Sequence, residues 1–395
     1  MKIGILGPFN PQVISERFPS GTELPTINAF AASVNTFVRA LVQDGHQVTV
    51  FTEYPFPGEQ KTITGDGIKI VMVSNRFSPR GFGRYRVIGR LEEAVKRELP
   101  ELEVLHAQWT YEYAMAARSF AGSLPLFCSI RDWSPYLKKK AKGLKGFYNT
   151  RLADLMFRQV IATPEIRFLA NSPYIQRCMA ERCPGRTVSL IPNPIRSDRI
   201  LNDRSSYPDH PTFISISQNL DNPIKNIDTL LAGFQQYYLH QPCAGLILVG
   251  GYSEEWKRER EEKGLLRGVE LTGALSHEMI FSALDRADTL VHPSLEETFG
   301  NILLEAMSRR VLCIGGEKSG AVPDVLGAGS RGILCDVTDP ESIAAALRQA
   351  HASDRTGMVD RATDYLLTTC SDKQVVCSHI ALYSQAIRET AATNG

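Results

Sequence analysis

Short apolar strands alternate with helical segments along the chain, and this rhythm limits the fold more than any other feature. In the first half, apolar segments of strand length occupy residues 2–6, 47–52, 104–106, 126–130, 167–170 and 188–191. Residues 27–44 carry apolar side chains at helical spacing, at Phe30, Val34, Phe37, Val38 and Leu41. Such alternation is typical of a parallel sheet with helices on both faces.

The rhythm stops and then restarts, which indicates two domains. Residues 192–211 are rich in proline, asparagine, aspartate and serine, so we expect an interdomain linker at residues 194–211. Beyond it, strands are expected at 213–217, 245–250, 269–272 and 289–291, and helices at 229–238 and 276–285. The expected fold class is therefore α/β, with two tandem doubly wound domains over residues 1–193 and 212–370. In such sheets ligands bind at the carboxyl ends of the strands, so we expect a site in the cleft between the domains.

The charge of the chain is divided between its two halves. Residues 1–193 hold 25 Lys and Arg against 16 Asp and Glu, a balance of +9. Residues 194–395 hold 19 against 27, a balance of −8, so the total is only +1. We therefore expect the two halves to have different partners.

Several classes of protein are disfavoured by what the sequence lacks. No uncharged apolar run reaches the roughly 18 residues of a membrane-spanning helix, and residues 3–6 are too short an apolar run for a signal peptide. The eight cysteines are scattered, without metal-binding spacing, which favours free thiols in a reducing compartment. No recognised nucleic-acid-binding module accompanies the basic residues. We expect a cytoplasmic protein that does not bind nucleic acid.

The strongest local signal is the segment Pro-Ser-Leu-Glu-Glu-Thr-Phe-Gly-Asn-Ile-Leu-Leu-Glu-Ala-Met at residues 293–307. It follows an expected strand and His292, which we interpret as a packing residue. A helix is expected to begin near Gly300, with Leu303, Leu304 and Met307 on its buried face. A helix N-terminus that follows a strand and a loop offers free amides to a phosphate, so the segment predicts an anion site.

Two carboxylates in this segment, Glu297 and Glu305, suit a long ligand better than a hydrolytic pair. Eight helical positions would separate their α-carbons by about 12 Å, whereas the carboxyl groups of glycoside hydrolases lie about 5–9.5 Å apart. The plainer alternative is a helix cap at Glu297 and an exposed helical glutamate at Glu305.

The segment resembles the signature of family 4 of the retaining GT-B glycosyltransferases, also called glycosyl transferases group 1. The family's other motifs are similar to residues 45–50, 106–107, 130–133, 191–194, 225–226, 271–273 and 320–324, in the same order. The resemblance covers most of the chain and implies two Rossmann-like domains that face a cleft. The C-terminal domain would bind a nucleotide-sugar donor and the N-terminal domain an acceptor. A last helix within residues 371–395 would cross back to the N-terminal domain.

The resemblance implies a hexosyltransferase that moves a sugar from a nucleotide-diphosphate-sugar to an acceptor hydroxyl with retention of configuration, in polysaccharide or glycoconjugate biosynthesis. A diphosphate leaving group needs stabilisation of its charge. The sequence contains no Asp-x-Asp motif to hold a metal for this purpose. Lys225 and a helix N-terminus would serve instead, so we expect no metal and no cofactor.

The resemblance also implies roles for particular residues. Glu297, Lys225 and Arg131 are expected to be catalytic. Donor-binding residues are expected to be Glu305 (on the ribose hydroxyls), Phe299, Gly300, Asn301, Ile302, Gln218, Gly273 and Ala274. Acceptor-side residues are expected to be His106, Gln108, Asp132 and Gly21. The plainer alternatives are an ion pair between Arg131 and Asp132, and a buried structural role for His106.

One departure from the family pattern keeps a second function open. Gln218 stands where the family usually has an arginine on the β-phosphate, so this chain lacks one cation there. The alternative is a nucleotide-sugar-binding GT-B protein with weak or no transferase activity. A hydrolase or epimerase on the same fold is a third interpretation.

Two basic stretches in the first half predict an anionic partner. They contain Arg76, Arg80, Arg84, Arg86 and Arg90, and Lys138, Lys139, Lys140, Lys142 and Lys145. Basic residues with apolar neighbours can rest on an anionic membrane or bind a lipid-linked or anionic glycan acceptor. We expect a peripheral contact with the inner membrane face through the lysine stretch. The alternative is a solvated charged surface without a partner.

Overall fold

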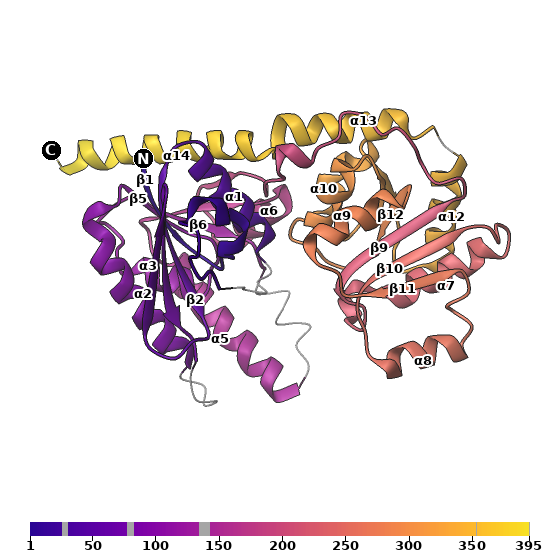
Figure 1. Ribbon diagram of the computed structural model, residues 1–395, viewed down its shortest axis with the longest axis horizontal. Coiled ribbons are helices and arrows are strands. Elements are labelled where there is room, and N and C mark those ends of the chain that lie inside the picture. The colour runs from indigo at the N-terminus through magenta and orange to yellow at the C-terminus, as the bar shows by residue number, and fades with distance from the viewer. Residues whose placement is uncertain (26–30, 77–82, 134–142, 353, 395) are drawn as a thin grey trace. The chain divides into compact units, whose positions relative to one another are not determined.

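The computed structural model describes residues 1–25, 31–76, 83–133, 143–352 and 354–394, which form two compact units (Figure 1). One unit contains Met1–Pro194 and Asp372–Gly395, and the other contains Ile195–Ser371. This division differs from the expected linker at 194–211, because the residues from Ile195 onward belong to the second unit. Ile195 is buried in the core of that unit, and Arg204 donates to the carbonyls of Asp285 and Ala287.

Within the described residues, the first unit is built on an eight-stranded sheet in the order β3-β4-β2-β1-β5-β6-β7-β8. The strands are β1 (Lys2–Leu6), β2 (Gln47–Tyr54), β3 (Gln60–Gly65), β4 (Ile68–Ser74), β5 (Val104–Ala107), β6 (Leu126–Ile130), β7 (Ile166–Ala170) and β8 (Val188–Leu190). All neighbouring strands are parallel except β3 and β4, which form a hairpin. The sequence analysis missed β3, although Asp66-Gly67 between the strands is a typical hairpin turn and Gly67 has a φ of +73°.

Helices cover both faces of this sheet. Successive side chains of a strand point to opposite faces, and the strands are apolar on both, so each face has to be buried. The face that carries Ile3 and Ile5 packs against α1 (Ala32–Gln43) and α14 (Asp372–Asn394). The face that carries Leu6 and Phe51 packs against α2 (Gly83–Glu98), α3 (Glu112–Arg118), α5 (Gly143–Ile161) and α6 (Pro173–Arg182). The last helix of the chain therefore contributes to the core of the first unit, where Tyr383 is fully buried.

The second unit has a sheet in the order β11-β10-β9-β12-β13-β14, whose paired strands are all parallel. The strands are β9 (Thr212–Asn219), β10 (Gly245–Gly251), β11 (Val269–Gly273), β12 (Thr289–His292), β13 (Leu312–Gly316) and β14 (Ile333–Cys335). One face packs against α7 (Ile227–Tyr238), α8 (Glu254–Glu262) and α12 (Pro340–Ala352). The other packs against α9 (His277–Asp285), α10 (Asn301–Ser308), α11 (Val322–Val325) and α13 (Thr356–Tyr365). The predicted α/β class is confirmed in both units.

Candidate functional site

The loop between β12 and α10 lies at the point where the strand order of the second sheet reverses. β9 is flanked by β10 on one side and by β12 on the other, and ligands of doubly wound sheets bind at such a point. Gly300 caps α10 in the left-handed conformation, with a φ of +86°, which only glycine adopts readily. Asn301 is exposed and Ile302 is partly buried in the first turn, so the N-terminus of the helix begins at an exposed residue. The predicted helix start and its buried face are confirmed.

Glu297 in this loop is held by two basic side chains. Lys225 Nζ donates to Glu297 Oε1 at 2.5 Å, and His292 Nε2 donates to the same oxygen at 3.2 Å. Burial alone would raise the pKa of Glu297, but the hydrogen bonds and charges of His292 and Lys225 outweigh it. The pKa of Glu297 therefore lies well below its usual range, and this carboxylate is ionised. Glu297 is not a helix cap, and His292 contacts a predicted site residue instead of only packing.

A short turn brings Lys225 to Glu297 from a distant part of the sequence. Asn222 Oδ1 accepts a hydrogen bond from the Ile224 amide, which stabilises the 3₁₀ turn at Pro223–Lys225. The Ile224 carbonyl in turn accepts from the Leu295 amide at 2.8 Å. This backbone hydrogen bond joins the Lys225 turn to the loop that carries Glu297. The backbone therefore holds the two charged residues next to each other.

The same loop is supported from its other side by Gly320. The Ala321 amide donates to the Glu297 carbonyl at 2.9 Å, and Gly320 has a φ of +60°. A Cβ atom at position 320 would lie 2.3 Å from the Glu297 carbonyl oxygen, which is closer than atoms can approach. Glycine at this position therefore lets the 319–321 segment approach the Glu297 loop.

Gly320→Ala should lower both stability and nucleotide affinity. The left-handed backbone and the clash together cost about 1–3 kcal/mol, and any relief of the clash moves Glu297. Thermal unfolding of the full chain, with and without nucleoside diphosphate, measures both effects. Gly89→Ala in α2 is the control, because a Cβ there meets no heavy atom within 4 Å. Equal midpoints and equal nucleotide shifts in the two variants would contradict the role of Gly320.

Glu305 is buried in α10 and is held by a residue that the sequence analysis missed. Its side chain accepts a hydrogen bond from His277 Nε2 at 3.1 Å, and the residue is only 8% exposed. The interpretation of Glu305 as an exposed helical glutamate is therefore wrong. His277 is the first residue of α9 and follows Ser276, which caps that helix. Nothing in its spacing relative to Glu305 signals the contact, which forms only when α9 and α10 pack.

Removal of His277 should cost stability in a pH-dependent way. The hydrogen bond that His277 donates to Glu305 outweighs burial and raises the pKa of His277. A group with a raised pKa in the folded state contributes stability that is fully present below its unfolded pKa, about 6.5, and is lost as pH rises through the folded value. His277→Ala should therefore lower the unfolding midpoint more at about pH 6 than at about pH 8.5. The exposed His351 provides the control variant His351→Ala. An equal loss at both pH values would contradict this expectation.

The remaining predicted donor residues lie at the carboxyl ends of β9, β11 and β12. Gln218 is exposed near the end of β9. Gly273 ends β11 with a φ of +74°, and the exposed Ala274 follows it. Phe299 is 2% exposed and packs in the core, so only its backbone is available to a ligand.

Predicted site residues of the first unit, both catalytic and acceptor-side, lie at the carboxyl ends of β5 and β6. Gln108 follows β5, and Arg131 follows β6. Arg131 donates to Gln108 Oε1 at 2.6 Å, to Ser33 Oγ at 3.1 Å and to the side-chain oxygen of Asn193. Burial lowers the pKa of Arg131 to about 10, although the charge of Asp132 partly offsets this effect. Arg131 is thus a positive group in a network that spans four segments of the chain.

The other predicted residues of this unit have different surroundings. Asp132 accepts a hydrogen bond from Trp109 Nε1 at 2.5 Å. His106 is fully buried, as in the plainer interpretation of this residue. Gly21 is exposed with a φ of +84° in the loop after the 3₁₀ helix Pro11–Arg17. Of the three predicted catalytic residues, Lys225 and Glu297 meet in the second unit, and Arg131 lies in the first.

The two basic stretches are only partly within the described residues. Arg84 pairs with Glu112 at 3.0 Å, and Arg90 donates to the Ser74 carbonyl at 2.9 Å. Arg80 and Lys138, Lys139, Lys140 and Lys142, together with the side chain of Lys145, lie outside the described residues. The predicted membrane contact falls on that segment and stays a prediction.

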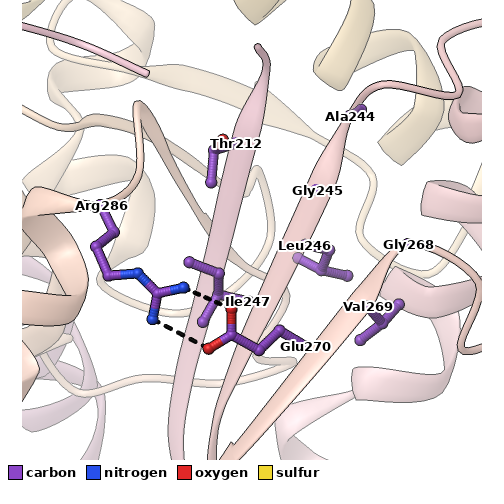
Figure 2. A pocket seen from close by; sticks show the side chains of 9 residues that line it. All are labelled: Thr212, Ala244, Gly245, Leu246, Ile247, Gly268, Val269, Glu270 and Arg286. Carbon is purple, nitrogen blue, oxygen red and sulfur yellow. Dashed lines mark hydrogen bonds and ion pairs between the residues drawn. The ribbon is translucent and has the colours of Figure 1, made fainter. Parts of the chain in front are cut away.

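A cavity of about 540 Å³ lies away from the candidate site, at the amino ends of β9, β10 and β11 (Figure 2). Thr212, Gly245 and Val269 begin these strands and line the cavity. Figure 2 shows Arg286 and Glu270 pointing toward each other beside it, paired at 3.0 and 2.6 Å. None of the predicted site residues lines this cavity, and its charged side chains neutralise each other.

The described residues contain neither a metal-binding cluster nor a membrane-spanning helix. No group of three or more His, Cys, Asp or Glu side chains there is arranged to hold a metal ion. No described helix combines the length and the apolar character needed to cross a membrane.

Comparison with protein families matches both halves of the chain. Residues 31–199 match the family model described as Glycosyltransferase Family 4, and residues 198–363 match the model described as Glycosyl transferases group 1. Among curated proteins, the phosphatidylinositol N-acetylglucosaminyltransferase gpi3 subunit of Schizosaccharomyces pombe is 32% identical over 222 residues. The match covers 52% of this chain and 47% of that protein, so the chain spans about half the length of this relative.

Solved structures share the fold over nearly the whole chain. Sucrose-phosphate synthase from Thermosynechococcus elongatus aligns with a TM-score of 0.74 and 16% identity, over 98% of each chain. The Anabaena protein Alr3699/HepE, solved in complex with UDP and glucose, aligns with a TM-score of 0.70 and 15% identity, over 98% of this chain and 100% of that one. These likenesses confirm the two-domain GT-B fold class that the sequence predicts.

Proposed function

Because the chain belongs to the family 4 glycosyltransferases, we propose that it transfers a sugar from a nucleotide-diphosphate-sugar to an acceptor hydroxyl, with retention of configuration and without a metal ion. The observation that carries this proposal is the cluster of Lys225, Glu297 and the N-terminus of α10. It places a cation, a helix N-terminus and an ionised carboxylate at the switch point of a doubly wound sheet. That combination suits a ligand with both phosphate and hydroxyl groups.

Lys225 and the start of α10 would stabilise the diphosphate as it leaves. An ammonium group has three donors, so Lys225 can contact Glu297 and still donate to a phosphate oxygen. The N-terminus of α10 adds the positive end of the helix dipole. Both are fixed before the reaction begins, which is the condition for effective stabilisation of developing charge.

The two glutamates would bind the hydroxyl groups of the donor. Glu297 is ionised and accepts hydrogen bonds, which suits contact with the transferred sugar. Glu305 accepts from His277 through Oε1, and its second oxygen would accept from a ribose hydroxyl. His277 would hold the carboxylate in one orientation for this contact.

Retention would follow from attack on the face from which the diphosphate leaves. The acceptor oxygen forms its bond to the anomeric carbon as the bond to the diphosphate oxygen breaks, and the acceptor proton passes to that diphosphate oxygen. The products are the glycoside and a nucleoside diphosphate. The lowered pKa of Glu297 supports this route, because a carboxylate with so low a pKa is a poor proton acceptor.

We propose a uridine diphosphate sugar as donor and a lipid-linked or anionic molecule as acceptor. UDP and glucose are bound in the Anabaena structure of the same fold. The curated relative from Schizosaccharomyces pombe is named for a phosphatidylinositol acceptor. The balance of +9 over residues 1–193 favours an anionic acceptor on the first unit.

Removal of metal ions should leave transfer unchanged. In the proposed site, Lys225 and the start of α10 supply the charge stabilisation that a metal supplies elsewhere. The initial rate should be the same in the presence of excess EDTA as in the presence of added Mg²⁺ or Mn²⁺. A rate that falls on chelation and returns with either ion would contradict this part of the proposal.

A second candidate is a protein that binds the nucleotide sugar but does not transfer it. The exposed Gln218 at the end of β9 favours it, because the family usually has an arginine there. Thermal unfolding with UDP, GDP, ADP and their sugars tests donor binding first, since a ligand at 100 times its Kd adds about 2.7 kcal/mol. Transfer is then measured as release of nucleoside diphosphate in the presence of an acceptor extract. Binding without release would favour the second candidate over the first.

A further inference from the structure

A buried chain of polar contacts joins the C-terminal helix α14 to Arg131. Tyr383 Oη lies 2.5 Å from His106 Nδ1, and the two residues are 277 positions apart in the sequence. The amide nitrogen of Gln108 lies 3.1 Å from the same Nδ1 and 3.3 Å from Nε2, and Gln108 Oε1 accepts from Arg131 at 2.6 Å. Tyr383, His106 and Gln108 are all fully buried. The sequence predicts site roles for His106, Gln108 and Arg131 and none for Tyr383.

The directions of these hydrogen bonds follow from Arg131. A guanidinium has only donors, so the oxygen of Gln108 faces Arg131 and its NH₂ group faces His106. The phenol of Tyr383 is a better proton donor than the hydroxyl of Ser129, which lies 2.8 Å from His106 Nε2. Nδ1 of His106 therefore accepts from Tyr383, and its Nε2 carries the proton and donates to Ser129 Oγ. Since Nδ1 has one lone pair, the NH₂ group of Gln108, which is near both ring nitrogens, contacts the ring without competing for that bond.

We propose that Tyr383 is a positioning residue for sugar transfer: its hydroxyl fixes the His106 ring, and His106 through Gln108 fixes the Arg131 guanidinium at the carboxyl end of β6. The inference rests on the proposed function and on the prediction that Arg131 is a catalytic residue of the first unit. The order of action is Tyr383, His106, Gln108 and Arg131, and only Arg131 reaches the reacting molecules.

The surroundings support a neutral His106 in this role. Burial lowers the pKa of His106 well below its usual range, and the nearby His379 and Arg131 lower it further. The pKa of the neighbouring His379 is lowered to about 4, chiefly by burial and also by the charge of Arg131. The hydrogen bond from His379 Nδ1 to the Val375 carbonyl has the opposite effect on this pKa, smaller than that of burial. A second positive charge beside Arg131 is thus avoided, and a neutral ring can accept at Nδ1 and donate at Nε2 at once.

A purely structural role would not need this set of polar groups. Buried polar side chains cost free energy unless every donor and acceptor is satisfied, and apolar residues of similar volume pack at lower cost. Here the chain of contacts ends at Arg131, a cation that follows β6 and that the family resemblance assigns to the site. The arrangement therefore orients Arg131 more than it stabilises the core.

Tyr383→Phe tests the proposal because it removes only the hydroxyl. The kcat for transfer should fall by about tenfold or more, as expected for a displaced contact group, while the KM for the donor and the nucleotide-induced thermal shift stay unchanged. Tyr237→Phe is the matched control, because Tyr237 is a buried tyrosine of the second unit whose hydroxyl has no hydrogen-bond partner among the described residues. A wild-type kcat in Tyr383→Phe would overturn the proposal.

A double-mutant cycle tests whether Tyr383 acts through His106. His106→Gln should also lower kcat, and the double variant should be no slower than His106→Gln alone, because both changes break the same chain of contacts. Losses in kcat that add fully would overturn the order of action.

Nitrogen NMR of the histidine side chains tests the network without any activity. In the wild-type protein the His106 signal, assigned by its loss in His106→Gln, should be that of a neutral ring protonated at Nε2. In Tyr383→Phe the Nδ1 resonance should move, because its acceptor bond is lost. A ring protonated at Nδ1 in the wild type would overturn the proposal, even if Tyr383→Phe did not fold. If the wild-type protein transferred no sugar, this spectrum would still decide the network, so the two failures are distinguishable.

Discussion

Lys225→Ala should lower the rate of sugar transfer by more than about tenfold, the loss expected when one fixed donor to a developing oxyanion is removed. Lys225 is the cation that the 3₁₀ turn places on Glu297, 2.5 Å from its carboxylate. Its loss removes positive charge from the leaving diphosphate and leaves Glu297 with His292 as its remaining basic partner. The decrease should therefore fall mainly on kcat, measured as release of nucleoside diphosphate.

The control for this experiment is Lys263→Ala, which removes an exposed lysine at the end of α8 in the same unit. Its rate should equal that of the wild type. Near-normal turnover in Lys225→Ala would show that the diphosphate is stabilised elsewhere, and it would remove Lys225 from the mechanism.

Glu305→Ala should also reduce kcat/KM by more than about tenfold, because hydrogen bonds to a charged acceptor are worth about 1.5–3 kcal/mol. This carboxylate is buried, and His277 fixes one of its oxygens. The decrease should appear chiefly as a higher KM for the donor, since the ribose does not change during the reaction. Calorimetric titration with the nucleoside diphosphate should show the same loss of affinity.

Glu262→Ala provides the matched control, because Glu262 is an exposed glutamate on α8 whose ion pair with Arg258 is long, at 4.0 Å. Its donor affinity should be that of the wild type. Unchanged donor affinity in Glu305→Ala would place the ribose away from α10.

Local sequence patterns were sufficient for most strands and for the start of α10. The strands at 2–6 and 126–130 have the predicted bounds, because each is a continuous apolar run that both faces of a sheet bury. The left-handed Gly300 and the buried face of α10 follow from residue types within a few positions. Lys225 and Glu297 are far apart in the sequence. Only the resemblance to a known family predicted that they share one site.

Contacts that depend on packing could not be read from the sequence. His277 and Glu305 meet because α9 and α10 lie together, and Tyr383 meets His106 because α14 packs on the first sheet. Neither pair has a spacing that signals contact. The expected linker failed for a related reason: its prolines and polar residues are typical of a loop, but Ile195 finds a place in the core of the second unit. A polar loop and a segment that packs on a domain can have the same composition. They are distinguished by their tertiary contacts, which the local sequence does not show.

The measurement that tests the central claim most directly is the stereochemistry of transfer by the wild-type protein. UDP-, GDP- and ADP-sugars are each incubated with the protein and an acceptor extract, and the anomeric proton of the product is observed by NMR. We expect one donor to release its nucleoside diphosphate and to form a glycoside with the anomeric configuration of the donor, and we expect Lys225→Ala to suppress this product. A glycoside of inverted configuration, or nucleotide binding without any release, would contradict retaining transfer at the Lys225–Glu297 site.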